Sequence, residues 1–388
     1  MHLNPLDEFY LNLCLQNAWQ NQLLTLPNPA VSALVLDGNG AILSLESHKE
    51  CGKPHAEVLA LQKAYAILSK DDAILALEDS AQIHQYLAKN AKNLFYDSTI
   101  YVSLEPCSSQ KCGKTPSCAA LLNLLKPKRI VIGAKDFNPT AKGGVQELES
   151  HGIQTTKAWE ITSLQPIAQH AKDLLIPFES LQKRGKFVLY KYACRLDGSI
   201  NGGQISSKPA QSQMHNYRTK ANYLLISGKS VRLDKPTLDS RFATLDSKRA
   251  PHVLILTRNQ NFPKDAPLFG IPNREVRILH TLDFLLSSAP NAKSQKALNS
   301  LESLESQKPL KTLKFAESLE SSNLGFVLCE GGAGLFKNMQ PYIDMLLIIL
   351  NPSFNADNTL TMRLQESFHF LHSMQFGEDL FLWLIPKR

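Results

Sequence analysis

The stretch Pro54-His-Ala-Glu-Val-Leu-Ala-Leu-Gln-Lys-Ala-Tyr-Ala-Ile-Leu68 decides the fold of the first half of this chain. Its apolar residues recur every three or four positions, which predicts a helix with one buried face that begins near His55. Around it we expect a helix over 6–21, a hairpin of strands 30–36 and 41–45, strands over 98–104 and 129–133, and a helix over 117–125. Helices that alternate with strands predict an α/β layer structure.

A boundary between two domains, 1–180 and 181–388, is expected between Ile176 and Gly185, where the alternation of predicted helices and strands is interrupted. Beyond it, apolar strands are expected at 187–190, 223–228, 252–256, 325–329 and 345–350, with helical patterns between several of them. That order is typical of a largely parallel sheet that is covered on both faces. Two polar, helix-prone stretches, 69–97 and 284–323, are interpreted as insertions.

The composition is that of a globular protein, because 43% of the 388 residues are hydrophobic and 20% are charged. This is enough apolar surface for a core, which excludes extensive disorder. No apolar run approaches the roughly 18–20 residues of a membrane span. The first 20 residues have no basic segment followed by an apolar run, so we expect a cytoplasmic protein. The seven cysteines are then expected as thiols, core residues or metal ligands.

Net charge is divided unevenly between the two halves. Residues 1–180 carry 15 Lys and Arg against 18 Asp and Glu, whereas residues 181–388 carry 27 against 17. The positive excess of the second half predicts an anionic ligand. Nucleic acid is one candidate, and a phosphorylated substrate together with a phosphate-bearing cofactor is another.

One histidine and two cysteines have the order expected of a catalytic zinc site. His55 opens a helix, Cys107 follows a strand, and Cys118 opens another helix. One nitrogen and two sulfur ligands leave the fourth tetrahedral position of Zn²⁺ for a water molecule, whose pKa the metal lowers. Glu57, two residues after His55, is the candidate that takes the proton of this water and delivers it to a leaving amine. This arrangement is the signature of the zinc deaminases that act on nucleobase-like rings.

Two alternatives stay open at this point. Cys112 lies between the two proposed thiolate ligands and could replace either of them, although a Pro-Ser-Cys helix start favours Cys118. A purely structural role, in which His55 caps a helix and the cysteines are buried thiols, is the other alternative.

The first half resembles the deaminase half of the bifunctional deaminase/reductase family of riboflavin biosynthesis. The motifs that carry the resemblance are Pro27-Asn-Pro29, Gly52-Lys-Pro-His-Ala-Glu-Val58, Tyr101-Val-Ser-Leu-Glu-Pro-Cys107, Gly113-Lys-Thr-Pro-Ser-Cys-Ala119, Asp136-Phe-Asn-Pro139 and Gly143-Gly144. The resemblance implies a cytidine-deaminase-like three-layer α/β/α domain. It also implies that Asn28 and Asp136 hold a pyrimidine and its sugar phosphate, although both are ordinary turn residues beside proline.

The second half resembles the reductase half of the same family, through Lys191-Tyr-Ala-Cys-Arg-Leu-Asp-Gly198, Arg218, Gly228–Leu238, Arg241 and Glu330-Gly-Gly332. The resemblance implies a dihydrofolate-reductase-like α/β domain that uses NADPH. By motif position, the cofactor would contact Ala193, Ser230, Asp234, Gly331, Gly332, Ala333 and Gly334. The sugar phosphate of the substrate would lie among Lys191, Arg218, Leu238, Arg241 and Glu330. Guanidinium groups bind phosphate bidentately, but solvated surface arginines are the alternative.

The second half also departs from this family. Arg195 stands where the family has serine, the loop from Gly198 to Ser206 is short, and Gln204 replaces a common aromatic residue. The resemblance does not extend to Arg258, which follows a predicted strand. We expect Arg258 to bind the 2′-phosphate of NADPH, because ligands lie outside the carboxyl ends of parallel strands.

Together these features predict a bifunctional enzyme of riboflavin biosynthesis that contains Zn²⁺ and uses NADPH. Its expected substrate is a small pyrimidine ribotide, without nucleic acid or membrane partners, and the reductase halves are expected to pair as a homodimer. Three alternatives remain: an RNA deaminase with a binding module, a deaminase whose reductase half has decayed, and an interaction protein with structural zinc.

Overall fold

A computed structural model describes residues 4–108, 115–259, 263, 265–282, 324–355, 360–362 and 366–387. The chain forms two compact units, Met1–Phe178 and Glu179–Arg388, called here the N-terminal and C-terminal units. Helix α7 (Ile176–Arg184) runs through the division between them and through the boundary expected at residue 180. Cys112 and the whole of the stretch 284–323 lie outside the described residues.

The N-terminal unit is built on a mixed five-stranded sheet of order β2-β1-β3-β4-β5. The strands are β1 (Ser32–Leu36), β2 (Ile42–Ser47), β3 (Thr99–Leu104), β4 (Arg129–Ala134) and β5 (Gln154–Lys157). Strand β1 is antiparallel to both β2 and β3, whereas β3, β4 and β5 are parallel. The expected hairpin and the expected strands over 98–104 and 129–133 are confirmed, while β5, with the sequence Gln-Thr-Thr-Lys, has no apolar signal.

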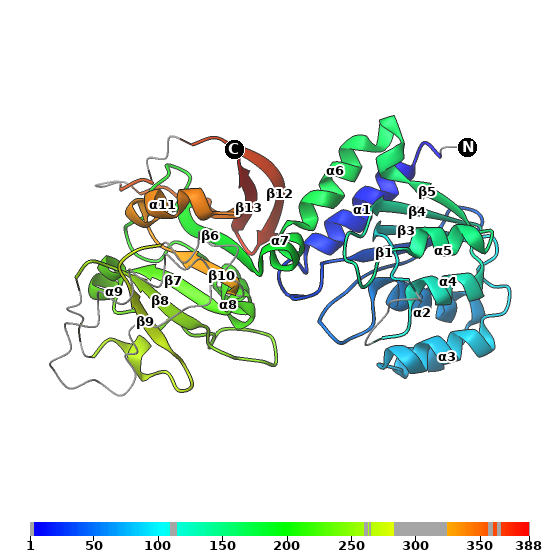
Figure 1. The fold of residues 1–388 in the computed structure, drawn as a ribbon, viewed down its shortest axis with the longest axis horizontal. Coiled ribbons are helices and arrows are strands. Elements are labelled where there is room, and N and C mark those ends of the chain that lie inside the picture. Colours follow the sequence, from blue (N-terminus) through cyan, green and yellow to red (C-terminus); the bar gives the residue numbers. More distant parts are fainter. Residues whose placement is uncertain are drawn as a thin grey trace, which may run out of the picture. The chain divides into compact units, whose positions relative to one another are not determined.

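Helices cover both faces of this sheet, which makes three layers (Figure 1). Helices α1 (Asp7–Trp19) and α6 (Gln165–Leu174) lie on one face. Helices α2 (Ala56–Ser69), α3 (Ser80–Asn90), α4 (Cys118–Leu125) and α5 (Gly144–Ser150) form the layer on the other face. All residues of β1 and β4 are buried, as expected for strands that are covered on both sides.

The stretch 69–97, interpreted as an insertion, is folded onto this second layer. It contains a short 3₁₀ helix (Asp72–Ala76) and α3, whose first turn is capped by the side chain of Asp79. Ile83 and Leu87 bury the apolar face of α3 in the same core cluster as the apolar residues of α2 and α4.

The C-terminal unit has an eight-stranded sheet of order β12-β13-β11-β6-β10-β7-β8-β9. Its strands are β6 (Lys186–Arg195), β7 (Tyr223–Ser227), β8 (His252–Leu256), β9 (Val276–Leu279), β10 (Gly325–Glu330), β11 (Met345–Asn351), β12 (Phe368–Phe376) and β13 (Asp379–Pro386). Six neighbouring strands, from β11 to β9, are parallel, which confirms the expected parallel core. Strands β12 and β13 add an antiparallel hairpin that the sequence analysis did not predict.

Alternate residues of the parallel strands enter two separate cores. Leu225 and Leu254 pack in one cluster with Phe336 of α11 (Ala333–Met339). Leu224 and Val253, which point to the opposite face, pack in the other cluster with Val231 of α9 (Gly228–Asp234). Helix α8 (Lys208–Lys220) precedes β7 and buries Met214 and Tyr217.

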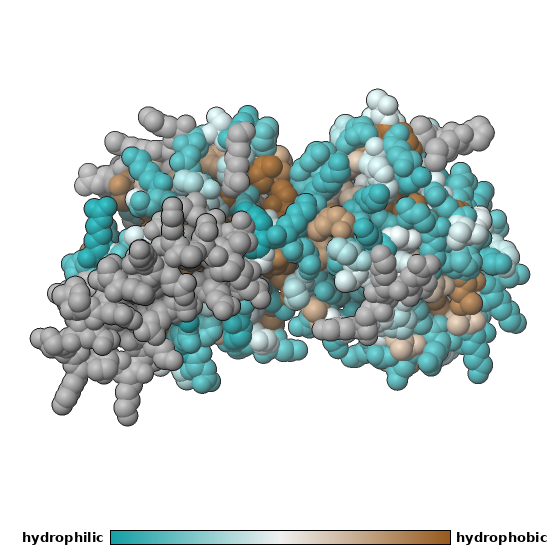
Figure 2. Space-filling view, viewed as in Figure 1, coloured by the Kyte–Doolittle hydropathy of each residue, from teal (hydrophilic) through white to brown (hydrophobic). Residues whose placement is uncertain are grey.

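The face of the N-terminal unit shown in Figure 2 is mainly hydrophilic, and its apolar residues form small patches. Among the helices that the structure describes, none combines the length and the apolar character needed to cross a membrane.

Candidate zinc and nucleotide sites

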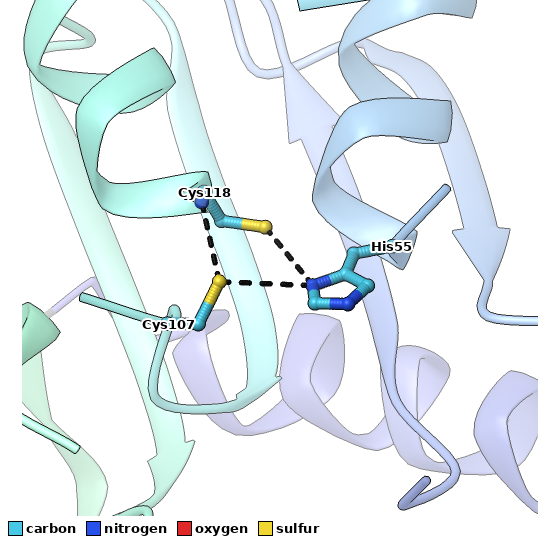
Figure 3. Close-up of side chains that lie close together, drawn as sticks. All are labelled: His55, Cys107 and Cys118. Carbon is cyan, nitrogen blue, oxygen red and sulfur yellow. Dashed lines mark hydrogen bonds between the residues drawn. The ribbon is translucent and has the colours of Figure 1, made fainter. Parts of the chain in front are cut away.

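His55, Cys107 and Cys118 lie together beyond the carboxyl end of β3, the middle strand of the N-terminal sheet (Figure 3). Their ligand atoms all lie within 4.8 Å of one another. The Sγ atoms of Cys118 and Cys107 lie 3.4 and 3.7 Å from Nδ1 of His55. The structure therefore brings together the three residues predicted as metal ligands.

Local structure explains why these side chains converge. His55 is the extended residue before α2, and Cys118 is the first residue of α4. Cys107 follows β3, and its carbonyl oxygen accepts hydrogen bonds from the Ser117 hydroxyl (2.7 Å) and the Ala119 N–H (3.1 Å). The Ser117 hydroxyl also caps α4, so a single side chain ties the start of this helix to the loop after β3.

The spacing of the three donor atoms fits Zn²⁺. Bond lengths of about 2.3 Å to sulfur and about 2.0 Å to nitrogen place tetrahedral ligand atoms roughly 3.5 Å apart. The two sulfur-to-nitrogen separations of 3.4 and 3.7 Å match this value. One nitrogen and two sulfur donors are a zinc-type set, and burial lowers the pKa of His55, which favours the neutral imidazole that a metal requires.

Glu57 is buried beside this cluster, in the first turn of α2. Burial raises the pKa of its carboxyl above the usual value, against the opposite effect of hydrogen bonds from its own backbone and from the Cys118 side chain. A carboxyl group whose pKa is raised binds a proton more readily than an exposed one, which suits a group that takes up a proton and later releases it.

Thr115 contacts the far side of the His55 ring, a role that the sequence analysis did not assign. Its Oγ1 lies 3.5 Å from Nε2 of His55, opposite the nitrogen that faces the two sulfurs. A hydroxyl in this place can accept a hydrogen bond from the Nε2–H group. This bond favours the tautomer in which Nδ1 carries no proton and can bind a metal.

His48 orients Asn28, and its role was also missed. Its Nδ1 lies 3.1 Å from the carbonyl oxygen of Pro54, which can only accept, so Nδ1 carries the proton. Burial lowers the pKa of His48 and keeps the ring neutral, so Nε2 accepts from the amide group of Asn28 at 3.1 Å. The Oδ1 atom of Asn28 is therefore presented as an acceptor.

Asp136 lies in the loop after β4, which is held by the buried carboxylate of Glu105. That carboxylate accepts from the backbone N–H groups of Asp136 (3.0 Å), Gly143 (3.1 Å) and Val145 (3.0 Å). Burial raises the pKa of Asp136 to about 6, and the charge of Glu105 acts in the same direction. Glu105 belongs to the Leu-Glu-Pro-Cys motif, but nothing in the sequence indicates these three contacts.

In the C-terminal unit, a cavity of about 980 Å³ lies along the carboxyl ends of the parallel strands. It is lined by residues that follow β7, β8, β9 and β10. Six of the eight predicted cofactor residues line it: Ser230, Asp234, Arg258, Gly332, Ala333 and Gly334. Gly331 and Ala193 are not among its lining residues. Such an edge is where α/β sheets bind nucleotides.

None of the five residues predicted for the sugar phosphate lines this cavity. They lie on β6, α8 and β10 and in the segment that follows α9. Arg218 forms a bidentate ion pair with Glu330, at 2.8 and 2.9 Å, and donates to the carbonyl oxygen of Asp239 at 3.1 Å. Lys191 is the register partner of Glu330 on the adjacent strand. Burial lowers the pKa of Lys191, against the opposing charge of Glu330.

Two further predicted residues differ in exposure. The Arg241 side chain is 54% exposed, and it contacts Asp239 at 3.4 Å and the ring of Phe242. It is therefore open to an incoming anion. Leu238 is buried in a core cluster with its backbone in the left-handed region, so its contact with a ligand would be through the backbone.

Two family models match the chain, one in each unit. The model of the cytidine and deoxycytidylate deaminase zinc-binding region matches residues 5–134, and the RibD C-terminal domain matches residues 186–381. The chain is 27% identical to the riboflavin biosynthesis protein RibD of Bacillus amyloliquefaciens, over 98% of this chain and 97% of that protein. It is 25% identical to RibD of Aquifex aeolicus, over 92% and 89% of the two chains.

Solved structures share the fold over almost the whole length. A deaminase/reductase from Thermotoga maritima superimposes with a TM-score of 0.61 and 22% identity, covering 98% of this chain and 99% of its own. RibD from Acinetobacter baumannii gives a TM-score of 0.59 with the same identity and coverage. The expected cytidine-deaminase-like and dihydrofolate-reductase-like domains are thereby confirmed. Full-length relatives and both domain models agree, and the chain belongs to the RibD family of bifunctional riboflavin-biosynthesis deaminase/reductases.

Proposed function

We propose that the N-terminal unit deaminates 2,5-diamino-6-ribosylamino-4(3H)-pyrimidinone 5′-phosphate, and that the C-terminal unit reduces the ribosyl group of the product to ribityl with NADPH. The observation that carries the deaminase half is the convergence of His55, Cys107 and Cys118 beside the buried Glu57. The substrate names follow from membership of the family.

His55, Cys107 and Cys118 would hold Zn²⁺, which activates a water molecule for attack on the amino-bearing ring carbon. Glu57 accepts a proton from this water and delivers it to the departing amine, which leaves as ammonia. Asn28 offers Oδ1 as an acceptor for an N–H group of the pyrimidine, because His48 engages its amide nitrogen. Asp136, when ionised, accepts a hydrogen bond from a substrate hydroxyl.

The test compares Glu57→Gln with the wild-type chain. Zinc content and ammonia release are measured on both, with Glu78→Gln, which alters a carboxylate whose side chain is 86% exposed, as the matched control. We expect one zinc per chain in all three proteins. Ammonia release should fall roughly 10²–10⁴-fold in Glu57→Gln alone, the range for a lost general acid–base group. Full activity in Glu57→Gln, or a wild-type chain that binds no zinc, would refute the deaminase proposal.

For the reductase half, the cavity supplies positive charge for a phosphorylated cofactor. Lys229, Arg232 and Arg258 line it, against the single carboxylate of Asp234. NADPH supplies the hydride, and the protein positions it and binds its phosphates. We assign the 2′-phosphate to Arg258, which follows β8.

The Arg258→Ala variant tests this assignment. Dissociation constants for NADPH and NADH are measured on the wild type and the variant. We expect NADPH to bind at least tenfold more weakly in the variant and NADH to bind unchanged, because a charge-assisted hydrogen bond contributes about 1.5–3 kcal/mol. An unchanged ratio of the two constants would show that another group selects the cofactor.

The remaining partners stay predictions. We propose that the chain acts on a small molecule, without nucleic acid, and that it pairs through the C-terminal unit. Sedimentation equilibrium on the full chain tests the pairing, and a dominant monomer at micromolar concentration would contradict it.

A further inference from the structure

Arg195 lies at the end of β6, and its side chain is buried against backbone rather than against a carboxylate. The residue is only 7% exposed. Its guanidinium group donates to the backbone carbonyl oxygens of Asn201, Gly202 (3.0 Å) and Gln204 (3.4 Å). None of the ion pairs among the described residues includes Arg195. A buried charge is costly unless it is hydrogen-bonded, so these carbonyl groups are held to the guanidinium.

Side-chain hydrogen bonds hold the two ends of the segment 201–204: Oδ1 of Asn201 accepts from the N–H of Leu360, and Nε2 of Gln204 donates to the carbonyl oxygen of Ser206. Gly202, Gly203 and Gln204 are exposed, and both glycines have positive φ angles, so these three residues contribute no buried side chain. Fixing a backbone residue costs about 1–2 kcal/mol of conformational entropy. The hydrogen bonds from Arg195 offset this cost for a segment that buries almost no apolar surface.

This segment is continuous with one wall of the cofactor cavity. Ile200, Leu360 and Thr361 line the cavity. The N–H of Ile200 donates to the carbonyl oxygen of Leu360 at 2.8 Å, and the N–H of Leu360 donates to Oδ1 of Asn201 at 3.0 Å. Arg195 therefore holds Asn201, and Asn201 holds the two residues that form the wall.

We infer that Arg195 is a positioning residue for the nicotinamide cofactor. It holds residues 201–204 so that the Ile200–Leu360 wall is formed before NADPH arrives. This inference rests on the proposed reductase function. A cavity wall that is already ordered lowers the entropy that binding costs, so the effect of Arg195 is on cofactor affinity and not on the hydride step.

The test compares Arg195→Ser, which installs the residue expected at this position in the family, with the conservative Arg195→Lys. Arg277→Ser is the matched control, because it removes an arginine of the same unit that pairs with Glu275 and does not line the cavity. NADPH dissociation constants, kcat at saturating NADPH, and hydrogen exchange at the amides of Ile200 and Leu360 are measured on all variants. Protection of the amides of the buried strands β6 and β10 in the same hydrogen-exchange measurement reports that the C-terminal unit of each variant is folded.

We expect Arg195→Ser to weaken NADPH binding by about tenfold or more and to speed exchange at both amides, with kcat within about twofold of the wild type. Arg195→Lys should lie between the two, because a lysine donates to fewer of the three carbonyl groups. Equal NADPH affinity in the wild type and Arg195→Ser would overturn the inference and leave the reductase proposal standing. A wild-type chain that does not bind NADPH would instead refute the reductase proposal, and the inference with it.

Discussion

The Glu105 carboxylate accepts a hydrogen bond from the backbone N–H of Asp136 at 3.0 Å, across the loops that follow β3 and β4. Glu105 stands two residues before Cys107, a proposed zinc ligand, and Asp136 is the proposed contact for the substrate sugar. This hydrogen bond therefore connects the loop that carries a proposed metal ligand to the loop that we propose binds substrate. It also brings the charge of Glu105 close to Asp136, where it contributes to the raised pKa of Asp136.

The first prediction concerns the pH dependence of substrate binding. The pKa of Asp136 is about 6, so the carboxylate becomes protonated as the pH falls through this value and no longer accepts from the substrate. We expect the KM of deamination to rise below pH 6, and Asp136→Asn to abolish this acid limb. In Glu105→Gln the limb should move to lower pH, because removal of the Glu105 charge lowers the pKa of Asp136.

Steady-state kinetics between pH 5 and pH 8 measure this effect, with zinc content as the control for an intact metal site. An acid limb that keeps its position in Glu105→Gln would show that the charge of Glu105 does not influence Asp136. An acid limb that persists in Asp136→Asn would show that another group titrates.

The second prediction concerns Thr115. Because its hydroxyl faces Nε2 of His55 at 3.5 Å, Thr115→Val should weaken zinc binding by about 10–100-fold, the usual effect of losing an outer partner of a metal-binding histidine. Thr115→Ser keeps the hydroxyl and should bind zinc like the wild type. Competition with a chromophoric chelator measures both affinities, and equal affinities in the valine and serine variants would contradict the role of the hydroxyl.

The convergence of the three candidate metal ligands could be predicted from the sequence because His and Cys are common zinc ligands, and because the start of each helix is visible locally. Ser117 is a typical helix cap, and the extended His55 precedes an apolar helical pattern. The contacts of Glu105 could not be predicted in this way. They join residues 31, 38 and 40 positions apart, and only the packing of the β3 and β4 loops brings them together.

The antiparallel hairpin of β12 and β13 is a part of the fold that the sequence analysis did not predict. Its turn contains Gly377 at a φ of +63°, between two stretches rich in aromatic residues and leucine, so the sequence does carry a signal for this hairpin. The residues proposed for the reductase site show that side-chain pairing is also hard to predict from the sequence. Arg218 and Glu330 were expected side by side at a phosphate, but the sequence could not reveal that they pair with each other.

The third prediction concerns Gly144, the first residue of α5. A Cβ atom at this position would lie 1.8 Å from the carbonyl oxygen of Pro106, a backbone atom next to Cys107. Gly144→Ala must therefore push apart the loops that Glu105 joins, and we expect a loss of about 1–3 kcal/mol or more in unfolding free energy, together with weaker zinc binding.

Gly270→Ala is the control for Gly144→Ala, because nothing lies within 4 Å of a Cβ there and its φ is not positive. Urea unfolding of zinc-loaded and chelated protein separates the two effects. Wild-type stability and zinc affinity in Gly144→Ala would contradict the close approach of Pro106.

The last prediction concerns acid stability of the C-terminal unit. Burial would raise the pKa of Glu330, but the charge and hydrogen bonds of Arg218 outweigh it and lower the pKa to about 2. A carboxyl group whose pKa is lower in the folded state stabilises the fold above its unfolded pKa, near 4.5, and loses this contribution as the pH falls toward 2. Glu330→Gln should therefore lower the unfolding free energy at pH 7 by about a few kcal/mol, and it should flatten the fall of this free energy between pH 4.5 and pH 2.

Fluorescence of the buried Trp383, in a chain with Trp19→Phe and Trp159→Phe, reports unfolding of this unit alone. Glu378→Gln, at an exposed site in the same unit, is the control, and an unchanged acid dependence in Glu330→Gln would show that the ion pair with Arg218 does not stabilise the fold.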